Sequence, residues 1–458
     1  MALAITYVLE KTTNEKIMST ETLPTIPQPV AAADRIKTVD LIRGFALLGI
    51  LLMNIPGFGI NWGSWPAIID GPHNSKDFYV LAAIESFFDG TMRGLFSMLF
   101  GAGMILFTMN KQEVPGGPSV AEYYYRRLLW LLVFGMFNAF VLLWWGDILF
   151  YYALCGMLLF VFRKTNPKWL LVLGLLCMFI TMFKSQWNWN EFRGKRKAYN
   201  EAVAAEKENK KLTDEQQAAK TEWVEIEKRR TPDTANINPH LRTMQAGSYG
   251  TIFMDMLPQN ANNEIWWMYD GLWDMLGMMF IGMALFGWGF FSNKRSASTY
   301  AMWLLVGYGI GIPIGVLAFR EGLLGQFANL GHFVDSYRVN HGLLYDIRRI
   351  LLSVGHASLL MLIFKSRIVP WLMKALANVG QMAFTNYLMQ SIICTLFFYG
   401  YGLGYYGKLK FHEVYYVVLI VWIFQLIVSS IWLNYFRFGP FEWLWRSLTY
   451  WKKQPMKR

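Results

Sequence analysis

Long apolar runs separated by short polar connections dominate this chain. Each run has about 20 residues, the length that an α-helix needs to cross the hydrocarbon core of a bilayer. The pattern predicts about ten membrane-spanning helices, an additional helix at 78–90, and a tight turn at Trp145–Asp147 between the third and fourth spans. The expected spans are 39–59, 94–110, 127–145, 147–162, 168–183, 268–291, 299–319, 342–364, 376–399 and 413–436.

One polar stretch, residues 184–265, interrupts the apolar pattern. Glu and Lys are mixed along it, and Thr213 followed three residues later by Gln216 is typical of a capping box at the start of a helix. Pro232 should end that helix. The stretch therefore predicts a solvated helical hairpin, which we expect to be a solvent-facing cap in preference to a dedicated binding domain.

These patterns predict an all-α polytopic membrane protein with a helical extracytoplasmic insert. The N-terminal tail is rich in proline and is expected to be disordered. The expected units are a cytoplasmic tail at 1–34, an N-terminal transmembrane bundle at 35–183, the insert at 184–265, and a C-terminal transmembrane bundle with a terminal amphipathic helix at 266–458.

The composition agrees with a membrane protein, because only 16% of the residues are charged, against about 25% in soluble domains. The net charge is +12, but Lys and Arg collect in alternate short loops, as they do on the cytoplasmic side of membrane proteins. We therefore expect both termini in the cytoplasm and a lipid bilayer, not nucleic acid, as the partner. Cys155, Cys177 and Cys394 lie inside apolar runs without metal-ligand spacing, so neither disulfides nor a metal site are predicted.

The first span begins with charged residues: Asp40 and Arg43 stand three residues apart, and Gly44 follows. In a structural interpretation, Asp40 is favourable in the first turn of a helix and Arg43 pairs with it or reaches the membrane surface. In a functional interpretation, Arg43 binds a phosphate through two parallel hydrogen bonds, and Gly44 lets a ligand or another backbone come close. The residues alone leave both interpretations open.

Polar side chains within membrane helices usually face the bundle interior and often mark function. We expect four of them, Asn54, Asp147, Asn386 and Gln390, to bind substrate. The other polar residues of the spans are Asn138, Asp270, Asp274, Arg348, Arg349 and His356.

Histidines that can act as a general base on the non-cytoplasmic side are His73, His332 and His341, and the local sequence does not choose among them. His356 lies in an apolar span and is expected to be a packing residue.

The C-terminal segment FGPFEWLWRSLTY predicts an amphipathic helix on the cytoplasmic membrane surface. Pro440 suits its first position, and Glu442 can pair with Arg446 one turn later. Such a helix is either a membrane anchor or a lid over a cytoplasmic ligand site.

Five segments together resemble the YeiB-like family of bacterial polytopic membrane proteins, whose C-terminal half carries a domain of unknown function 418. They are spread along the chain from Arg35, apart from the insert. The segments are RIKTVDLIRGFALLGILLMN, GLFSMLFGAGM, RRLLWLLVFGMFNAFVLLWWGDILFYYALCG, GQMAFTNYLMQS and GPFEWLWRSLTY.

The first segment also resembles the entry helix of transmembrane acyltransferases such as heparan-α-glucosaminide N-acetyltransferase. That resemblance implies acetyl-CoA or another acyl-CoA as the donor, held by Asp40, Arg43 and Gly44. It also implies His73 as the catalytic residue, because the glucosaminide enzyme has its catalytic histidine between the first two spans. Many YeiB-like proteins have a histidine before the tryptophan-rich turn, where this chain has Asn138, which cannot act as a base.

The leading hypothesis is an acyltransferase of the bacterial inner membrane that moves an acyl group from cytoplasmic acyl-CoA to an envelope glycan, a lipid or a secreted acceptor. The alternative is a transporter or flippase without chemistry, in which Asp147, Asp270 and Asp274 serve proton coupling. A third hypothesis is a scaffold that docks partners through the insert. The sequence leaves the oligomeric state open, a homodimer included.

Overall fold

The computed structural model describes residues 36–61, 68–69, 71–109, 117–228 and 234–458. The regular elements of these residues are helices, accompanied by one isolated antiparallel bridge between Phe436 and Lys457, so the predicted all-α class is confirmed. Within the described part of the chain, six helices are long and apolar enough to cross a membrane, which supports a multi-pass membrane protein. These are Lys37–Gly59, Lys76–Met109, Pro167–Lys207, Ala297–Ala328, Gly342–Ser366 and Phe411–Tyr435.

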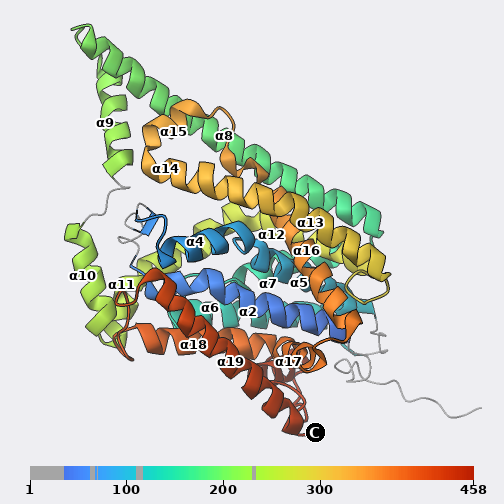
Figure 1. The fold of residues 1–458 in the computed structure, drawn as a ribbon. Coiled ribbons are helices and arrows are strands. Elements are labelled where there is room, and N and C mark those ends of the chain that lie inside the picture. Colours follow the sequence, from blue (N-terminus) through green and yellow to red (C-terminus); the bar gives the residue numbers. More distant parts are fainter. Residues whose placement is uncertain (1–35, 62–67, 70, 110–116, 229–233) are drawn as a thin grey trace, which may run out of the picture.

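Helices of the N-terminal part match the first four predicted spans in order (Figure 1). They are α2 (Lys37–Gly59), α5 (Thr91–Met109), α6 (Val120–Phe140), and α7 (Leu149–Leu159) with the 3₁₀ turn η3 (Phe160–Phe162). An additional helix, α4 (Lys76–Phe87), precedes α5. The helix expected near 78–90 is α4. The predicted end of the third span is wrong, because α6 ends at Phe140. Residues 141–148 form an irregular connection that includes a turn at Trp145 and Gly146, where a tight turn is predicted.

This connection between α6 and α7 lies inside the protein. Leu143 and Trp144 are only 1% and 2% exposed, and the Trp144 ring stacks on Phe58 of α2 with 3.8 Å between ring centroids. Leu143 has a φ of 57°, which a helix does not tolerate. Tyr399 donates a 3.3 Å hydrogen bond to the Leu143 carbonyl from 256 residues away. Tertiary contacts therefore end α6 where the local apolar pattern predicts that it continues.

The polar insert begins within a helix, because α8 (Pro167–Lys207) runs unbroken through the predicted start at 184. α9 (Asp214–Lys228) folds back along it, and both protrude from the bundle (Figure 1). The predicted capping box is confirmed: the Gln216 amide donates to Thr213 Oγ1 at 3.2 Å, and the Thr213 amide donates to Gln216 Oε1 at 3.1 Å. The predicted stop at Pro232 lies outside the described residues. The insert ends with α10 (Thr234–Ala246), α11 (Tyr249–Asn262) and the π-helix η4 (Asn263–Trp267).

The C-terminal part contains the remaining helices. They are α12 (Met268–Gly287), α13 (Ala297–Leu317), the π-helix η5 (Ala318–Leu324), α14 (Gly325–Ala328), α15 (Leu330–Ser336), the 3₁₀ turn η6 (His341–Leu344), α16 (Tyr345–Ser366), α17 (Pro370–Gln381), α18 (Ala383–Phe398), α19 (Phe411–Tyr435) and α20 (Pro440–Tyr450). The predicted span 376–399 is two helices that break at Met382. α20 begins at Pro440, as predicted.

α2 runs through the middle of the bundle and is buried over most of its length (Figure 1). It crosses α17 at a pair of glycines: a Cβ on Gly44 would collide with the Leu376 carbonyl, and one on Gly380 with the Asp40 carbonyl. The backbones of the two helices therefore touch at this crossing, which only small residues permit. The glycine after Arg43 makes room for another backbone.

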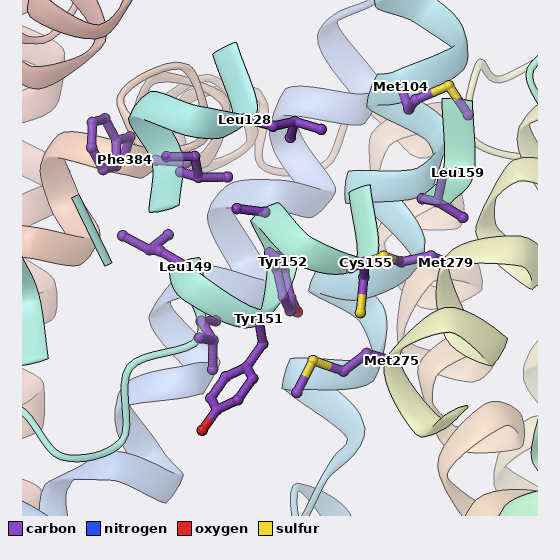
Figure 2. Close-up of a cluster of buried hydrophobic side chains, with 14 of the residues drawn as sticks. Met104, Leu128, Leu149, Tyr151, Tyr152, Cys155, Leu159, Met275, Met279 and Phe384 are labelled. Atoms are coloured by element: carbon purple, nitrogen blue, oxygen red, sulfur yellow. The ribbon is translucent and has the colours of Figure 1, made fainter. Parts of the chain in front are cut away.

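The largest buried apolar cluster surrounds α7 (Figure 2). Tyr152, Cys155 and Leu159 of α7 belong to one cluster with Met104 of α5 and Met279 of α12. All three cysteines are buried free thiols. This cluster forms one wall of the cavity described next.

Candidate functional site

A cavity of about 230 Å³ lies beside the first turns of α2, at the end of the bundle where α20 packs. Its walls come from α2, α5, α6, α7, α17, α18 and α20. Its lining includes the charged residues Asp40, Arg43, Arg127, Glu442 and Arg446 and a larger apolar and aromatic set. The cavity therefore combines a cluster of charges with a hydrophobic interior.

Asp40 and Arg43 both line this cavity. Arg43 Nη1 donates a 2.8 Å hydrogen bond to Asp40 Oδ1 one turn earlier in α2, and the two side chains are 24% and 11% exposed. The predicted ion pair is present, and it holds the guanidinium at the cavity wall. Gly44 does not line the cavity, because it faces α17.

A second guanidinium faces the cavity from α6. Arg127 Cζ lies 4.1 Å from the ring centroid of Trp445 on α20 and 5.2 Å from that of Phe107 on α5. The Trp445 indole donates a 2.8 Å hydrogen bond to the Arg127 carbonyl. The positive charges of Arg127 and Arg43 repel each other, so an anion between them is favoured.

Glu442 fixes α20 against the start of α18. Its Oε1 accepts hydrogen bonds from the amides of Phe384 at 2.7 Å and Thr385 at 3.0 Å, and its Oε2 accepts one from Thr385 Oγ1. These are the free amides of a helix N-terminus, where a carboxylate is favourable. Burial raises the pKa of Glu442, and the hydrogen bonds oppose that shift. Glu442 therefore caps the N-terminus of α18.

The mostly apolar lining of the cavity includes Tyr152, labelled in Figure 2, and Tyr387. The Tyr152 hydroxyl lies 2.6 Å from Ser97 Oγ. The Tyr387 hydroxyl accepts a 3.2 Å hydrogen bond from the Ile148 amide and donates a 3.3 Å hydrogen bond to Asp147 Oδ1. Tyr387 thus connects the cavity with the α6–α7 connection.

Asp147 is 2% exposed and lies behind Tyr387, outside the cavity lining. Asn138 Nδ2 donates to its Oδ1 at 2.8 Å, and the Phe150 amide donates to its Oδ2 at 3.0 Å. Asn138 and Tyr387 are therefore both side-chain partners of this carboxylate.

The other expected substrate-binding residues do not reach the cavity. Asn386 Nδ2 donates to Ser429 Oγ at 2.9 Å, and Gln390 Nε2 donates to Gln425 Oε1 at 3.1 Å. Both contacts join α18 to α19, as polar side chains between membrane helices commonly do. Asn54 is half-buried on α2 and is not part of the lining.

The candidate histidines lie outside the cavity lining as well. His73 is exposed in the turn before α4 and stacks on Phe78, with 4.4 Å between ring centroids. His332 lies 3.3 Å from Ser336 Oγ on α15, and the side chain of His341 is outside the described part of the structure. His356 has Tyr308 Oη at 2.7 Å and the Phe87 carbonyl at 3.2 Å, so both ring nitrogens are satisfied in the packed core.

Two histidine–aspartate pairs were not predicted. His240 Nδ1 lies 2.6 Å from Asp255 Oδ2 between α10 and α11, and His412 Nδ1 lies 2.7 Å from Asp77 Oδ1 between α19 and α4. The partners are 15 and 335 residues apart, so no local spacing indicates them.

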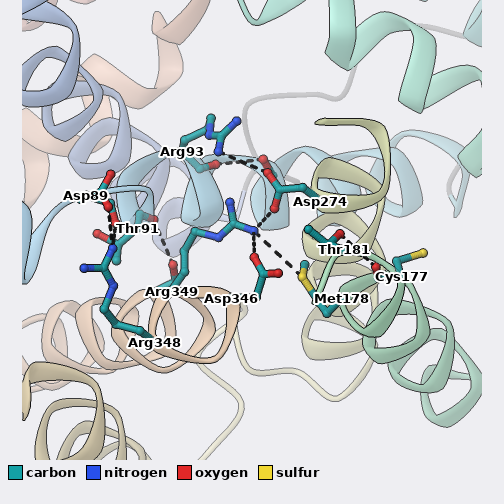
Figure 3. A network of polar contacts seen from close by, with 12 residues as sticks. Asp89, Thr91, Arg93, Cys177, Met178, Thr181, Asp274, Asp346, Arg348 and Arg349 are labelled. Atoms are coloured by element: carbon teal, nitrogen blue, oxygen red, sulfur yellow. Dashed lines mark hydrogen bonds and ion pairs between the residues drawn. The ribbon is translucent and has the colours of Figure 1, made fainter. Parts of the chain in front are cut away.

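Charged residues on α16 form a buried network that lies outside the cavity lining (Figure 3). Arg349 is 1% exposed and pairs with both Asp274 of α12 and Asp346. Arg93 of α5 lies 3.2 Å from Asp274. A second arginine of α16, Arg348, pairs with Asp89 at 2.6 Å. The three arginines and three aspartates balance in charge, which lowers the cost of burying them.

Comparison with known proteins gives relatives along almost the whole chain. A family model described as "Protein of unknown function (DUF418)" matches residues 285–452. The chain is 29% identical to the uncharacterized protein YxaH of Bacillus subtilis (strain 168) over 446 residues, which are 94% of this chain and 98% of that protein. It is 28% identical to the uncharacterized protein YeiB of Escherichia coli (strain K12) over 432 residues, which are 91% of this chain and 96% of that protein. No solved structure matches the chain significantly.

Proposed function

The chain belongs to the DUF418 family and is homologous to YeiB and YxaH over nearly its full length, and from this premise we propose that it is a transmembrane acyltransferase of the bacterial inner membrane. It takes an acyl group, acetyl being the first candidate, from cytoplasmic acyl-CoA. It delivers this group to an envelope glycan, a lipid or a secreted acceptor on the other side.

The proposed topology has ten crossings and both termini in the cytoplasm. The start of α2 and the C-terminal helix α20 lie at one end of the bundle, whereas α9 and α10 lie at the opposite end (Figure 1). This arrangement supports a cytoplasmic cavity and an extracytoplasmic insert, with the Lys- and Arg-rich short loops on the cytoplasmic side.

The single observation that carries the proposal is a cavity whose lining combines two guanidiniums, close enough for their charges to interact, with apolar side chains. Arg43 and Arg127 bind the phosphates of the donor, because guanidinium groups form paired hydrogen bonds with phosphate oxygens. The acyl thioester then lies along the apolar wall, with its carbonyl toward Tyr152 and Tyr387. Asp40 positions Arg43 for this task.

The acceptor side of the reaction needs a base near the opposite end of the bundle. His73, which the resemblance to acyltransferases implies, stays a prediction. The acceptor in this proposal is a compound of the envelope, or a secreted one, that carries a hydroxyl or amine group.

The test is the thermal stability of the purified protein in detergent with and without acetyl-CoA. Binding stabilises the folded state by mass action, by about 2.7 kcal/mol at a hundredfold excess over Kd. We expect acetyl-CoA to raise Tm in the wild type and to have a much smaller effect on Arg43→Ala. A transporter, flippase or scaffold that does not bind acyl-CoA would show equal Tm values with and without the ligand, and that result would overturn the proposal.

A further inference from the structure

Two amide side chains from the end of the insert donate hydrogen bonds to the last turn of α6 and to the α6–α7 connection. Asn260 of α11 donates a 2.5 Å hydrogen bond to the Ala139 carbonyl, and Asn263 of η4 donates a 3.1 Å hydrogen bond to the Trp145 carbonyl. Glu264 follows directly after Asn263, one turn beyond Asn260. The end of the insert is therefore held against the interior connection that carries Asp147.

Several buried oxygens around this contact have no hydrogen-bond partner among the described residues: Asn138 Oδ1, Asn260 Oδ1, and both carboxylate oxygens of Glu264. The three side chains are 0%, 1% and 7% exposed. Leaving a buried polar atom unpaired costs about 1–3 kcal/mol, and more for a charged group. All three side chains belong to the contact of α11 and η4 with the end of α6 and the residues after it: Asn260 bonds the Ala139 carbonyl, Asn138 bonds Asp147, and the charge of Asp147 reaches Glu264. Their unpaired oxygens are acceptors for a hydrogen-bond donor.

The electrostatics of the site agree with a proton-accepting role for Glu264. Burial, reinforced by the negative charge of Asp147, raises the pKa of Glu264 to about 8. The other ionisable groups that its charge reaches are the hydroxyls of Tyr151 on α7 and Tyr387 on α18. Glu264 also lies in a π-helix, a local distortion that occurs frequently at functional sites.

The chemistry of the site favours a hydroxyl compound. The unpaired oxygens accept hydrogen bonds, and the same connection has an unpaired buried donor, Trp144 Nε1. A hydroxyl group both donates and accepts. Within the described residues, no group of three or more His, Cys, Asp or Glu side chains could hold a metal ion, so a metal is the poorer fit.

We propose that Asn138, Asn260 and Glu264 bind a hydroxyl group of the acceptor, and that Glu264 is the base that removes its proton. This assignment rests on the proposed acyltransferase function. The acceptor oxygen attacks the acyl carbon, the carbon–sulfur bond breaks, and CoA leaves as a thiolate. Glu264 takes the hydroxyl proton and returns it to solvent, while the thiolate takes a proton from the cytoplasm. Tyr387, between Asp147 and the cavity, lies where the two substrates meet.

The test compares Glu264→Gln, Glu264→Asp and the surface control Glu201→Gln. Labelled acetyl transfer from acetyl-CoA into a bacterial envelope extract is measured together with acetyl-CoA binding and Tm. Loss of a general base lowers the rate by about 10²–10⁴-fold. We expect Glu264→Gln to lose about a hundredfold or more of transfer with unchanged acetyl-CoA binding, Glu264→Asp to regain part of it, and Glu201→Gln to match the wild type. Wild-type transfer should rise with pH through about 8, as Glu264 loses its proton.

Two results would overturn the assignment in different ways. Equal transfer by well-folded Glu264→Gln and wild type would remove Glu264 as the base and leave the acyltransferase function standing. A wild-type protein that does not bind acetyl-CoA would remove the acyltransferase function and this assignment with it.

Discussion

The guanidinium of Arg127 stacks on the ring of Trp445 at 4.1 Å, while the Trp445 indole donates a 2.8 Å hydrogen bond to the Arg127 carbonyl. This double contact fastens α20 to α6 across 318 residues of sequence. Together with the cap that Glu442 forms on α18, it makes the C-terminal helix a wall of the cavity. Of the two predicted roles of this helix, a surface anchor and a cover over a ligand site, the geometry supports the second.

Replacing Trp445 tests that role. Trp445→Ala removes a cation–π contact of about 0.5–2 kcal/mol and frees the Arg127 side chain from its defined position. We expect acetyl-CoA affinity to fall by about tenfold, measured by isothermal titration. The control is Trp371→Ala, a tryptophan of α17 that is 70% exposed, which should bind like the wild type. Equal affinity in the two variants would make α20 a membrane anchor only.

Arg43→Lys tests the donor site. Lysine keeps the positive charge but loses the planar fork that binds phosphate in two places. Loss of a charge-assisted hydrogen bond costs about 1.5–3 kcal/mol, on the order of a ten- to hundredfold weaker Kd for acetyl-CoA. Arg320→Lys, at an exposed position in η5, is the matched control. Unchanged affinity in a well-folded Arg43→Lys variant would reduce Arg43 to an ion-pair partner of Asp40.

Much of the fold follows from the local sequence, and its departures have tertiary causes. Apolar runs about 20 residues long, the capping box at Thr213 and a proline at the start of α20 are local signals, and helices form at all of them, although the run 376–399 is divided into two helices at Met382. The end of α6 depends on partners such as Tyr399 and Asn260, which are far away in the sequence. Hydropathy also predicts a boundary at 184 between a membrane span and the polar insert. The side chains change from apolar to polar there, but the backbone of α8 continues as one helix.

The candidate site was predictable only where its residues are neighbours in one helix. Asp40 and Arg43 stand one turn apart, so their pairing could be inferred. Arg127 and Trp445 are brought together only by packing. Glu264 lies in a polar stretch that the sequence presents as solvated, and its burial depends on how α11 contacts the α6–α7 connection.

Gly44→Ala tests the crossing of α2 and α17. The new methyl group would collide with the backbone carbonyl of Leu376, which cannot move without displacing α17. Overpacking of this kind lowers the free energy of unfolding by about 1–3 kcal/mol or more. Gly194→Ala is the matched control, because its Cβ meets nothing within 4 Å and alanine stabilises a helix by about 0.5–1 kcal/mol. We expect Tm to fall for the first variant and to hold or rise for the second. A Tm for Gly44→Ala equal to that of the wild type would contradict the close crossing.

Ala218→Cys tests the topology. Ala218 is exposed on α9, and the three native cysteines are buried, so the background labelling should be low. A membrane-impermeant maleimide should label the variant in intact cells whose outer membrane, if present, is permeabilised. Labelling that requires lysis of the inner membrane would place the insert in the cytoplasm and invert the proposed orientation.

His73→Ala decides between the two candidate bases. The resemblance to the glucosaminide enzyme implies that this variant binds acetyl-CoA but loses about 10²–10⁴-fold of transfer. The geometry favours the opposite result, because His73 is exposed and stacks on Phe78, whereas Glu264 is buried with both carboxylate oxygens unpaired among the described residues. We therefore expect labelled acetyl transfer within about twofold of the wild type, next to the large loss expected for Glu264→Gln. If His73→Ala instead abolishes transfer at full acetyl-CoA affinity, the loop histidine must reach the acceptor when substrates bind, and Glu264 is left to position the acceptor hydroxyl.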